Sequence, residues 1–267
     1  MRHALALEYD GRAFCGFQSQ PSGCGVQDAL ARALSGVADH PVAVAAAGRT
    51  DAGVHATSQI VHFESTANRP GTAWVRGVNA KLGAAAAVLW SRPVADDFHA
   101  RFAALGRHYT YLLQSRPERL ALNAGRIGWY HRPLDVPAMQ RAAARMLGEH
   151  DFSTFRAAQC QAHSPVKTLT RAQVQASGPL IRIDFSANAF LHHMIRNLVG
   201  ALVDIGVGNH DSAWIDVLLA ARDRSAAPPT FMADGLYFCG ADYEPRFGLP
   251  ATRREVTIVD TQRSASP

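Results

Sequence analysis

Hydrophobic and polar residues alternate along some segments of the chain and recur every three to four residues along others. Alternation is typical of half-buried strands, and a spacing near 3.6 residues is typical of helices with one buried face. The alternating segments predict strands over residues 4–9, 41–48, 58–65, 86–94, 107–115, 169–178, 180–190 and 235–243. The helical spacing predicts helices over residues 26–37, 71–82, 136–148, 189–205 and 211–222. The mixture indicates an α+β protein.

The order of these elements divides the chain into two similar parts. The first part runs strand, helix, two strands, helix, strand, and a comparable succession restarts after the segment DDFHARFAALG. We therefore expect a duplicated α+β architecture, in which each half is a sheet with helices on one face. The halves span residues 1–104 and 105–250, and residues 251–267 form a surface tail with room for a short strand.

The composition describes a globular protein with an arginine-rich surface. Hydrophobic residues make up 48% of the 267 positions, which is ample for a large core. The net charge is +5, and 25 of the 27 basic residues are arginine, the exceptions being Lys81 and Lys167. Arginine binds phosphate in a planar, bidentate geometry, which favours an RNA or DNA partner. A GC-rich genome produces the same bias, so charge alone leaves both explanations open.

We expect neither a membrane span nor a secretory signal. No run of about 18 apolar residues is present, and the N-terminal segment MRHALALEYDG reaches acidic residues too early for a signal peptide. The four cysteines are scattered and form no CxxC motif, which argues against a disulfide framework or a zinc site. They are Cys15, Cys24, Cys160 and Cys239. We therefore expect a cytoplasmic protein without membrane contact.

A glycine-framed acid and base stand out in the segment AGRTDAGVHATSQIVHF, which begins at Ala47. Arg49 and Asp51 are two residues apart, so in an extended backbone their side chains share a face and can pair. Pairing would keep the carboxylate ionised, as a nucleophile requires. Gly48 and Gly53 permit close approach by a bulky ligand. The alternative is a salt bridge that only stabilises the turn, and spacing alone does not exclude it.

Arg107, Tyr109 and Tyr111 alternate along one face of a predicted strand. An arginine next to aromatic residues on an open sheet face is how proteins stack single-stranded RNA bases and hold their phosphates. The alternative places both tyrosines in the core with only their hydroxyl groups hydrated.

The segment NAFLHHMIRNLVGALVDIG predicts a sharply amphipathic helix. His192, His193 and Arg196 fall opposite its apolar stripe, together with Asn197, and are either functional or simply solvated. Consecutive helical residues point about 100° apart, which argues against a metal site at the two histidines. We expect no bound metal, and Arg196 is the better functional candidate. The sequence also contains no nucleotide-binding or serine-hydrolase motif, so the chemistry must come from side chains.

These segments together resemble the tRNA pseudouridine synthase A family. The resemblance runs through LEYDGRAFCGFQSQP, GVQDALARALS, AGRTDAGVHATSQIVHF, DDFHARFAALGRHYTY, LGEHDFSTFRAAQCQ, NAFLHHMIRNLVGALVDIG and DGLYF, in collinear order up to about residue 250. It implies the pseudouridine synthase fold, in which two ferredoxin-like halves join their antiparallel sheets around a central basic cleft. It also implies a cofactor-free, homodimeric isomerase that converts uridine to pseudouridine at positions 38, 39 and 40 of the tRNA anticodon stem-loop.

The resemblance also implies roles for individual residues. Asp51 matches the catalytic aspartate and Arg49 its paired arginine, while Arg196 matches a second arginine at the carboxylate. Tyr109 matches the tyrosine that covers the target base, and Leu236 matches an apolar contact to that base. Arg107 is a further candidate for binding the substrate, on the pattern of its strand.

Two other functions remain open from the sequence. One is a catalytically silent tRNA-binding or chaperone protein that uses the same basic cleft. The other is an aspartate-based glycosidase, which is weakened because no second catalytic carboxylate is evident from the sequence.

Overall fold

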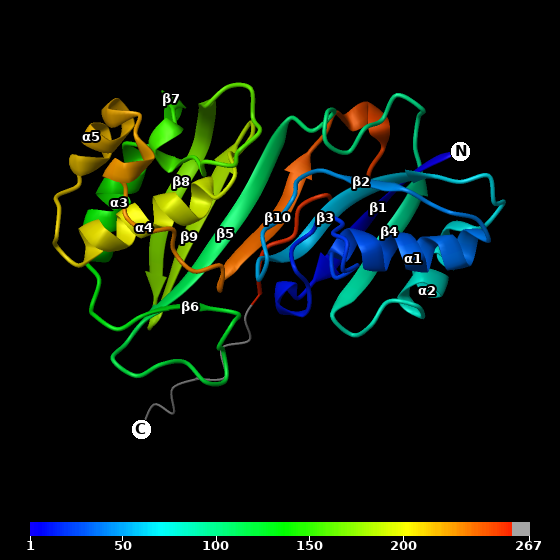
Figure 1. Cartoon of the computed structure of the whole chain (residues 1–267), viewed down its shortest axis with the longest axis horizontal. Coiled ribbons are helices and arrows are strands. Elements are labelled where there is room, and N and C mark those ends of the chain that lie inside the picture. The colour runs from blue at the N-terminus through cyan, green and yellow to red at the C-terminus, as the bar shows by residue number, and fades with distance from the viewer. Residues whose placement is uncertain (258–267) are drawn as a thin grey trace.

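The structure is a computed structural model that describes residues 1–257, and their strands form one ten-stranded sheet. The strands are β1 (Arg2–Tyr9), β2 (Val44–Ala46), β3 (His55–Glu64), β4 (Ala86–Pro93), β5 (Gly106–Ser115), β6 (Gly128–Tyr130), β7 (Gly148–Asp151), β8 (Val166–Ser177), β9 (Leu180–Ala187) and β10 (Leu236–Asp242). The helices are α1 (Val26–Ala38), α2 (Gly71–Asn79), α3 (Val136–Ala144), α4 (Met194–Gly206) and α5 (Trp214–Ala221). Figure 1 shows α1 and α2 at one end of the sheet and α3 to α5 at the other.

The two halves of the sheet repeat one topology. The strand order is β4-β1-β3-β10-β5-β9-β8-β7, with β2 paired to β3 and β6 paired to β5. Strands β1, β2, β3 and β4 therefore lie in the spatial order 4-1-3-2, and strands β5, β8, β9 and β10 repeat that order. In each half a helix follows the first strand and another precedes the last one. This strand–helix–strand–strand–helix–strand unit is the ferredoxin-like arrangement, so the predicted fold class is confirmed.

The halves join through β3 and β10. These two strands are parallel, with Tyr237 opposite His55 and Phe238 opposite Ala56. Every pairing among the four main strands of each half is antiparallel. The predicted joined antiparallel sheets are confirmed, and the seam that joins the two halves is itself parallel. At this seam the first residues of β3 pair with residues about 180 positions later in the chain.

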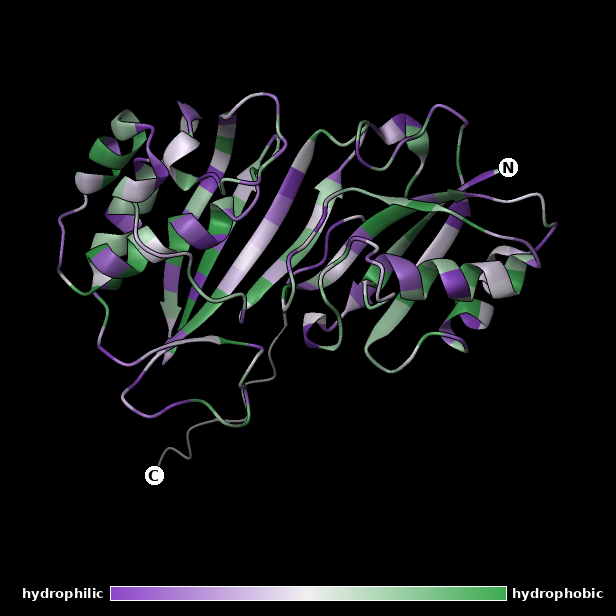
Figure 2. Ribbon diagram, viewed as in Figure 1, coloured by the Kyte–Doolittle hydropathy of each residue, from purple (hydrophilic) through white to green (hydrophobic). Residues whose placement is uncertain are grey.

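The two largest apolar core clusters lie one in each half, and a small third cluster forms around Leu112, Leu120 and Ile127. Leu30 and Leu34 of α1 are fully buried against β1 and β3, and burial of such a side chain stabilises the fold by about 1.5–3 kcal/mol. In the other half, α4 packs its apolar stripe on β8 and β9. Figure 2 shows hydrophilic residues near the start of β5 and hydrophobic ones further along it, and Tyr111 and Leu113 of β5 belong to this second core. The division at residue 104 stays a prediction, since one sheet spans both halves.

Most of the predicted elements are present, and two short strands were missed. Strands β6 and β7 have only three and four residues, too few for an alternating pattern to stand out. The predicted helix over residues 189–205 is wrong at its start. His193 adopts a left-handed backbone conformation, with φ of 61°, so the helix begins at Met194.

The polar side of α4 is covered rather than solvated. Asn197 is completely buried, where its side chain donates to the carbonyl of Phe155 at 2.8 Å and accepts from Arg224 at 3.2 Å. A side chain at Gly200 would come within 3.1 Å of the carbonyl of Pro229. The segment from Arg224 to Phe231 thus lies over the face that periodicity predicted to be exposed. The hydrophobic periodicity of one helix cannot show that a segment distant in sequence packs over its polar face.

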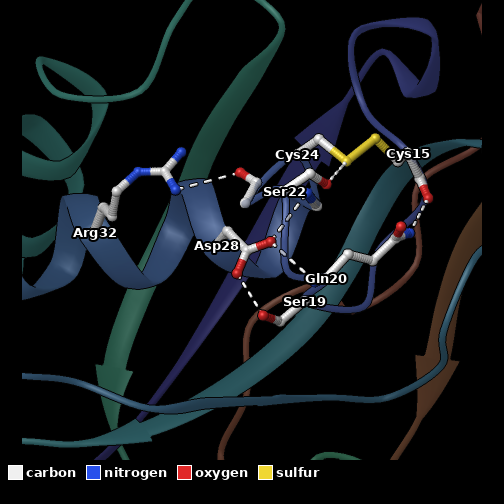
Figure 3. The surroundings of a disulfide bond; sticks show 9 residues. Cys15, Ser19, Gln20, Ser22, Cys24, Asp28 and Arg32 are labelled. Atoms are coloured by element: carbon white, nitrogen blue, oxygen red, sulfur yellow. Dashed lines mark hydrogen bonds between the residues drawn. A yellow bond between two sulfur atoms is a disulfide. The ribbon is translucent and has the colours of Figure 1, made fainter.

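A disulfide bond between Cys15 and Cys24 corrects the expectation drawn from the cysteine spacing. Their Cα atoms are 5.5 Å apart, and the bond closes the loop ahead of α1. Figure 3 shows Gln20 donating to the carbonyl of Cys15, and Asp28 accepting from Ser19 and Gln20 of the same loop. The prediction from cysteine spacing was wrong because it relied on motifs such as CxxC. A single disulfide that closes a short loop requires no such motif.

The expected tail lies partly outside the described residues. Within residues 251–257, Arg253 forms an isolated β-bridge with Gly240 in place of the predicted short strand. Residues 258–267 are not described. Among residues 1–257, no helix combines the length and apolar character that crossing a membrane requires.

Candidate active site

The loop between β2 and β3 carries Asp51 and is held on both sides. Gln59 of β3 donates from its side-chain amide to the carbonyl of Gly48 at 2.7 Å. The Thr50 side chain points inward, where its hydroxyl bonds with that of Tyr9 at 2.8 Å. Because Gly48 and Thr50 are both anchored, the Asp51 backbone between Thr50 and the turn at Gly53 has a fixed position.

The disulfide-closed loop packs directly against this anchored segment. The backbone N–H of Phe17 donates to the carbonyl of Thr50 at 2.9 Å. Gly16 has a φ of +100°, and a side chain there would come within 3.0 Å of the Thr50 carbonyl and 3.3 Å of Asp51 backbone. Glycine is therefore required at position 16 for both its conformation and its close approach. The conformation of the Cys15–Cys24 loop and the position of Asp51 are mechanically linked.

Asp51 meets Arg196, which comes from the other half of the molecule. The Arg196 guanidinium donates to Oδ2 of Asp51 at 3.0 Å and, through Nε, to the carbonyl of Phe231 at 2.8 Å. The Asp51 side chain is 21% exposed, so its carboxylate is reachable from solvent. Arg196 thus lies at the carboxylate, and the Phe231 carbonyl fixes the orientation of the guanidinium; the role of Arg196 stays a prediction.

Two histidines complete the surroundings of the carboxylate, and the sequence interpretation did not assign them there. Nε2 of His192 lies 3.3 Å from Oδ1 of Asp51, and Nε2 of His193 lies 3.4 Å from Oδ2. Burial is the largest effect and lowers the pKa of His193; Asp51 opposes it, and His192 and Arg196 lower the pKa a little further. In the sequence, the only indication of this arrangement is the adjacent pair His192-His193 ahead of a buried helix. The pair is assigned no specific role from the sequence because both residues are predicted to lie inside the helix.

Arg49 does not pair with Asp51, so that part of the prediction is wrong. Among residues 1–257, Arg49 forms no salt bridge, and its side chain is exposed. The pairing argument assumed an extended strand, but residues 48–51 form an irregular loop that turns Thr50 inward and Arg49 outward. Arg49 therefore presents a cation to solvent two residues from the carboxylate.

Tyr109 lies on β5 beside the same loop. Its ring packs edge-on against Phe190 and Phe238, with ring centres 5.2 and 5.0 Å away. A side-chain carbon on Gly48 would lie 3.8 Å from the Tyr109 hydroxyl, which places that hydroxyl beside the Asp51 loop. Burial raises the pKa of Tyr109 far above its ordinary value, and the charges of Tyr9 and Asp51 add to the effect. The hydroxyl is consequently protonated at neutral pH.

The other two predicted substrate-binding residues, Arg107 and Leu236, mainly make contacts within the protein. Arg107 donates to the carbonyls of Ala104 at 2.9 Å and Asn188 at 2.8 Å, and burial lowers its pKa. Leu236 is buried and belongs to the core of the C-terminal half. Substrate contacts by Arg107 and Leu236 stay predictions.

This arrangement provides a partly exposed carboxylate backed by a fixed guanidinium, next to an aromatic ring and an outward-facing arginine. Such a carboxylate can attack or stabilise an electron-poor carbon. Imidazole nitrogens and carboxylate oxygens are also common metal ligands. One such atom from each of Asp51, His192 and His193 lies within 4.8 Å of the other two.

Comparison with known proteins identifies the family. A family model described as tRNA pseudouridine synthase matches residues 5–103 and 142–244. Proteins named tRNA pseudouridine synthase A from Dechloromonas aromatica and Thiobacillus denitrificans are 59% and 57% identical to the chain over 250 residues. These alignments cover 94% of the chain and 95% and 96% of the two relatives. A third such protein, from Chromobacterium violaceum, is 58% identical over 252 residues. On this evidence, and with an aspartate–arginine pair joining its two ferredoxin-like halves, the chain belongs to the tRNA pseudouridine synthase family.

Proposed function

We propose that the protein isomerises uridine to pseudouridine at positions 38, 39 and 40 of the tRNA anticodon stem-loop, with Asp51 as the nucleophile. The observation that carries this proposal is the partly exposed Asp51 carboxylate, held by Arg196 at 3.0 Å across the seam between the halves. Relatives named tRNA pseudouridine synthase A share more than half of their residues with the chain, which supports an isomerase that acts on tRNA.

The target uridine must leave the RNA stack before it can react. Flipping a nucleotide into a pocket costs a few kcal/mol, which stacking on an aromatic ring helps to offset. Tyr109 provides that ring beside the Asp51 loop. Leu236 would add an apolar contact to the base.

Asp51 then acts on the bond between ribose C1′ and uracil N1. Breaking this bond develops positive charge on the sugar, and a fixed carboxylate stabilises or captures it. Arg196 keeps the Asp51 carboxylate ionised and aimed. The base turns and C1′ joins C5, after which C5 loses a proton and N1 gains one. All atoms are retained, so the reaction needs no cofactor or energy source.

Tyr109 is better suited to relay a proton than to act as a base that is already deprotonated before the reaction. Because burial raises its pKa, the hydroxyl is protonated at neutral pH. It can accept the C5 proton only while passing its own proton on, for example to water. A relay of this kind leaves the tyrosine unchanged after each turnover.

The outward-facing Arg49 is suited to hold RNA phosphate or the displaced strand near the site. The overall charge of +5 and a sequence pI of about 9.3 support binding along the same surface. Arg107 is the weaker candidate, because its guanidinium already donates to backbone carbonyls.

The assembly and the compartment are also proposals. A homodimer in the cytoplasm follows from the resemblance to the family, and sedimentation of a fully active monomer would contradict the dimer. In a reducing cytoplasm, the exposed Cys15–Cys24 loop would be open to reduction.

The test is to incubate unmodified tRNA transcripts with the purified protein and to map pseudouridine by carbodiimide treatment and reverse transcription. Signals confined to positions 38–40 are expected. Transcripts with cytidine at all three positions are the matched control and should remain unmodified. Absence of pseudouridine at every position would leave a silent tRNA-binding protein as the explanation, and release of free uracil would indicate a glycosidase.

A further inference from the structure

We propose that Asp51, His192 and His193 form a binding site for a borderline divalent cation such as Zn²⁺ or Co²⁺, which inhibits the enzyme by occupying its carboxylate. The binding step is independent of the proposed function, whereas the inhibition rests on Asp51 being the nucleophile. Catalysis itself does not use the ion.

The backbone at His193 brings the two imidazoles together. Its left-handed conformation, with φ of 61°, ends the irregular segment and starts α4 at Met194. Inside a helix, neighbouring side chains would diverge by about 100°. Here the two ring centres are 4.0 Å apart and both Nε2 atoms face Asp51. The argument from helical geometry against a metal site therefore does not apply.

The three candidate ligand atoms lie close enough together to share one ion. Zinc binds imidazole nitrogen and carboxylate oxygen at about 2.1 Å, which separates neighbouring ligands by about 3.4 Å in a tetrahedron. Nε2 of His192 lies 3.3 Å from Oδ1 and Nε2 of His193 lies 3.4 Å from Oδ2, so each imidazole faces its own carboxylate oxygen. One ligand atom from each of the three residues lies within 4.8 Å of the others. Two histidines and one carboxylate leave the fourth position open for water. This ligand set favours Zn²⁺ and Co²⁺ over Mg²⁺, which prefers oxygen ligands, so Mg²⁺ bound to tRNA would not compete.

The site is accessible from solvent. The side chains of Asp51, His192 and His193 are 21%, 39% and 30% exposed, so an ion can enter from solvent. Both imidazoles turn Nε2 toward Asp51, so an ion at the carboxylate meets two ring nitrogens. Arg196 opposes the ion because its charge lies 3.0 Å from Oδ2, and this repulsion makes the site reversible rather than permanently filled.

The experiment titrates the metal-free full-length protein with Co²⁺ in the absence of RNA and follows the visible absorption of the ion. We expect one ion per chain, with the intense bands of low-coordinate cobalt, and displacement by Zn²⁺. His192→Gln, His193→Gln and Asp51→Asn should each weaken binding at least about tenfold. His210→Gln is the matched control, since His210 also lies near an aspartate, 3.8 Å from Asp204, and should bind cobalt like the unmodified protein.

Three results would overturn the site. They are the absence of cobalt bands at millimolar metal, undiminished binding in His192→Gln and His193→Gln, or loss of binding in Cys160→Ser. The last would place the ion at the thiol next to the His192 backbone. If cobalt binds as expected but the metal-free protein makes no pseudouridine, the proposed function fails while the metal site stands. Zn²⁺ that binds without slowing pseudouridine formation would refute the inhibitory role.

Discussion

The Arg196 guanidinium and the Asp51 carboxylate lie 3.0 Å apart although 145 positions separate them in the chain. Asp51 belongs to the loop before β3 and Arg196 to the first turn of α4, so the pair spans the seam between the halves. The charge that supports the carboxylate comes from a distant element rather than from the neighbouring Arg49. We therefore assign Arg196 to the support of the Asp51 carboxylate and Arg49 to the binding of RNA.

Arg196→Met and Arg49→Met should therefore have different effects. Loss of Arg196 removes the group that aims Asp51, so kcat should fall by about 10²–10³ while the Kd for tRNA stays within a few-fold. Loss of Arg49 should weaken tRNA binding and reduce its salt dependence by about one counterion, with little change in single-turnover rate. Filter binding at several salt concentrations and single-turnover kinetics measure both quantities. Equal defects in the two variants would contradict the assignment.

Tyr109→Phe tests the hydroxyl without removing the ring. Phe keeps the edge contacts with Phe190 and Phe238 and the surface on which a base can stack. If the hydroxyl relays a proton, turnover should fall by about 100-fold or more while tRNA affinity is retained. Pseudouridine yield over time under single-turnover conditions provides the measurement. A rate equal to that of the unmodified enzyme would exclude a proton role.

The Cys15–Cys24 bond should be detectable by counting thiols. After equilibration with oxidised glutathione, the denatured protein should expose two thiols, those of Cys160 and Cys239, and four after reduction. Closing a loop of this length stabilises the fold by about 2–3 kcal/mol, so urea unfolding should shift with reductant. The double variant Cys15→Ser/Cys24→Ser should be insensitive to reductant. Four reactive thiols in the oxidised sample would show that the bond does not form.

Acid should destabilise the fold through His62. Burial lowers its pKa to about 4, and its Nδ1 accepts from the backbone N–H of Ala100 at 3.2 Å, which protonation would disrupt. The unfolded state, with a pKa near 6.5, then binds more protons, so stability falls as the pH drops from about 7 toward 4. Between pH 7.5 and 5 the expected loss is about 2 kcal/mol of unfolding free energy.

Urea unfolding at the two pH values measures this loss. His62→Gln should show a smaller pH dependence, and His131→Gln, a change at an exposed position, should follow the unmodified protein. The same pH dependence in all three proteins would rule out His62 as the cause.

The sequence predicted regular elements well because each strand and helix has its own local pattern. The strand of Gly106–Ser115 and the helix of Val26–Ala38 were placed within one residue of their ends. Strand order, and with it the parallel seam of β3 and β10, is not a local property. The short strands β6 and β7 carry too few residues for periodicity to detect.

The site was predictable in part for the same reason. The family resemblance implied Asp51 and Arg196 as partners, whereas residue spacing paired Asp51 with Arg49. The assumed extended backbone placed Arg49 at the carboxylate, whereas the inward turn of Thr50 directs it to solvent. One left-handed residue, His193, converts a predicted solvated helix face into the surroundings of Asp51. Hydrophobic periodicity does not predict the backbone conformation of a single residue such as His193.

The role of Asp51 is tested most directly by comparing Asp51→Asn with the unmodified protein on the same tRNA transcript. Asparagine has the same size but lacks the charge that stabilises or captures the reacting sugar. We expect pseudouridine at positions 38–40 to disappear from the carbodiimide map of the variant, while its tRNA affinity remains within a few-fold. Pseudouridine formation by Asp51→Asn at the unmodified rate would contradict the account.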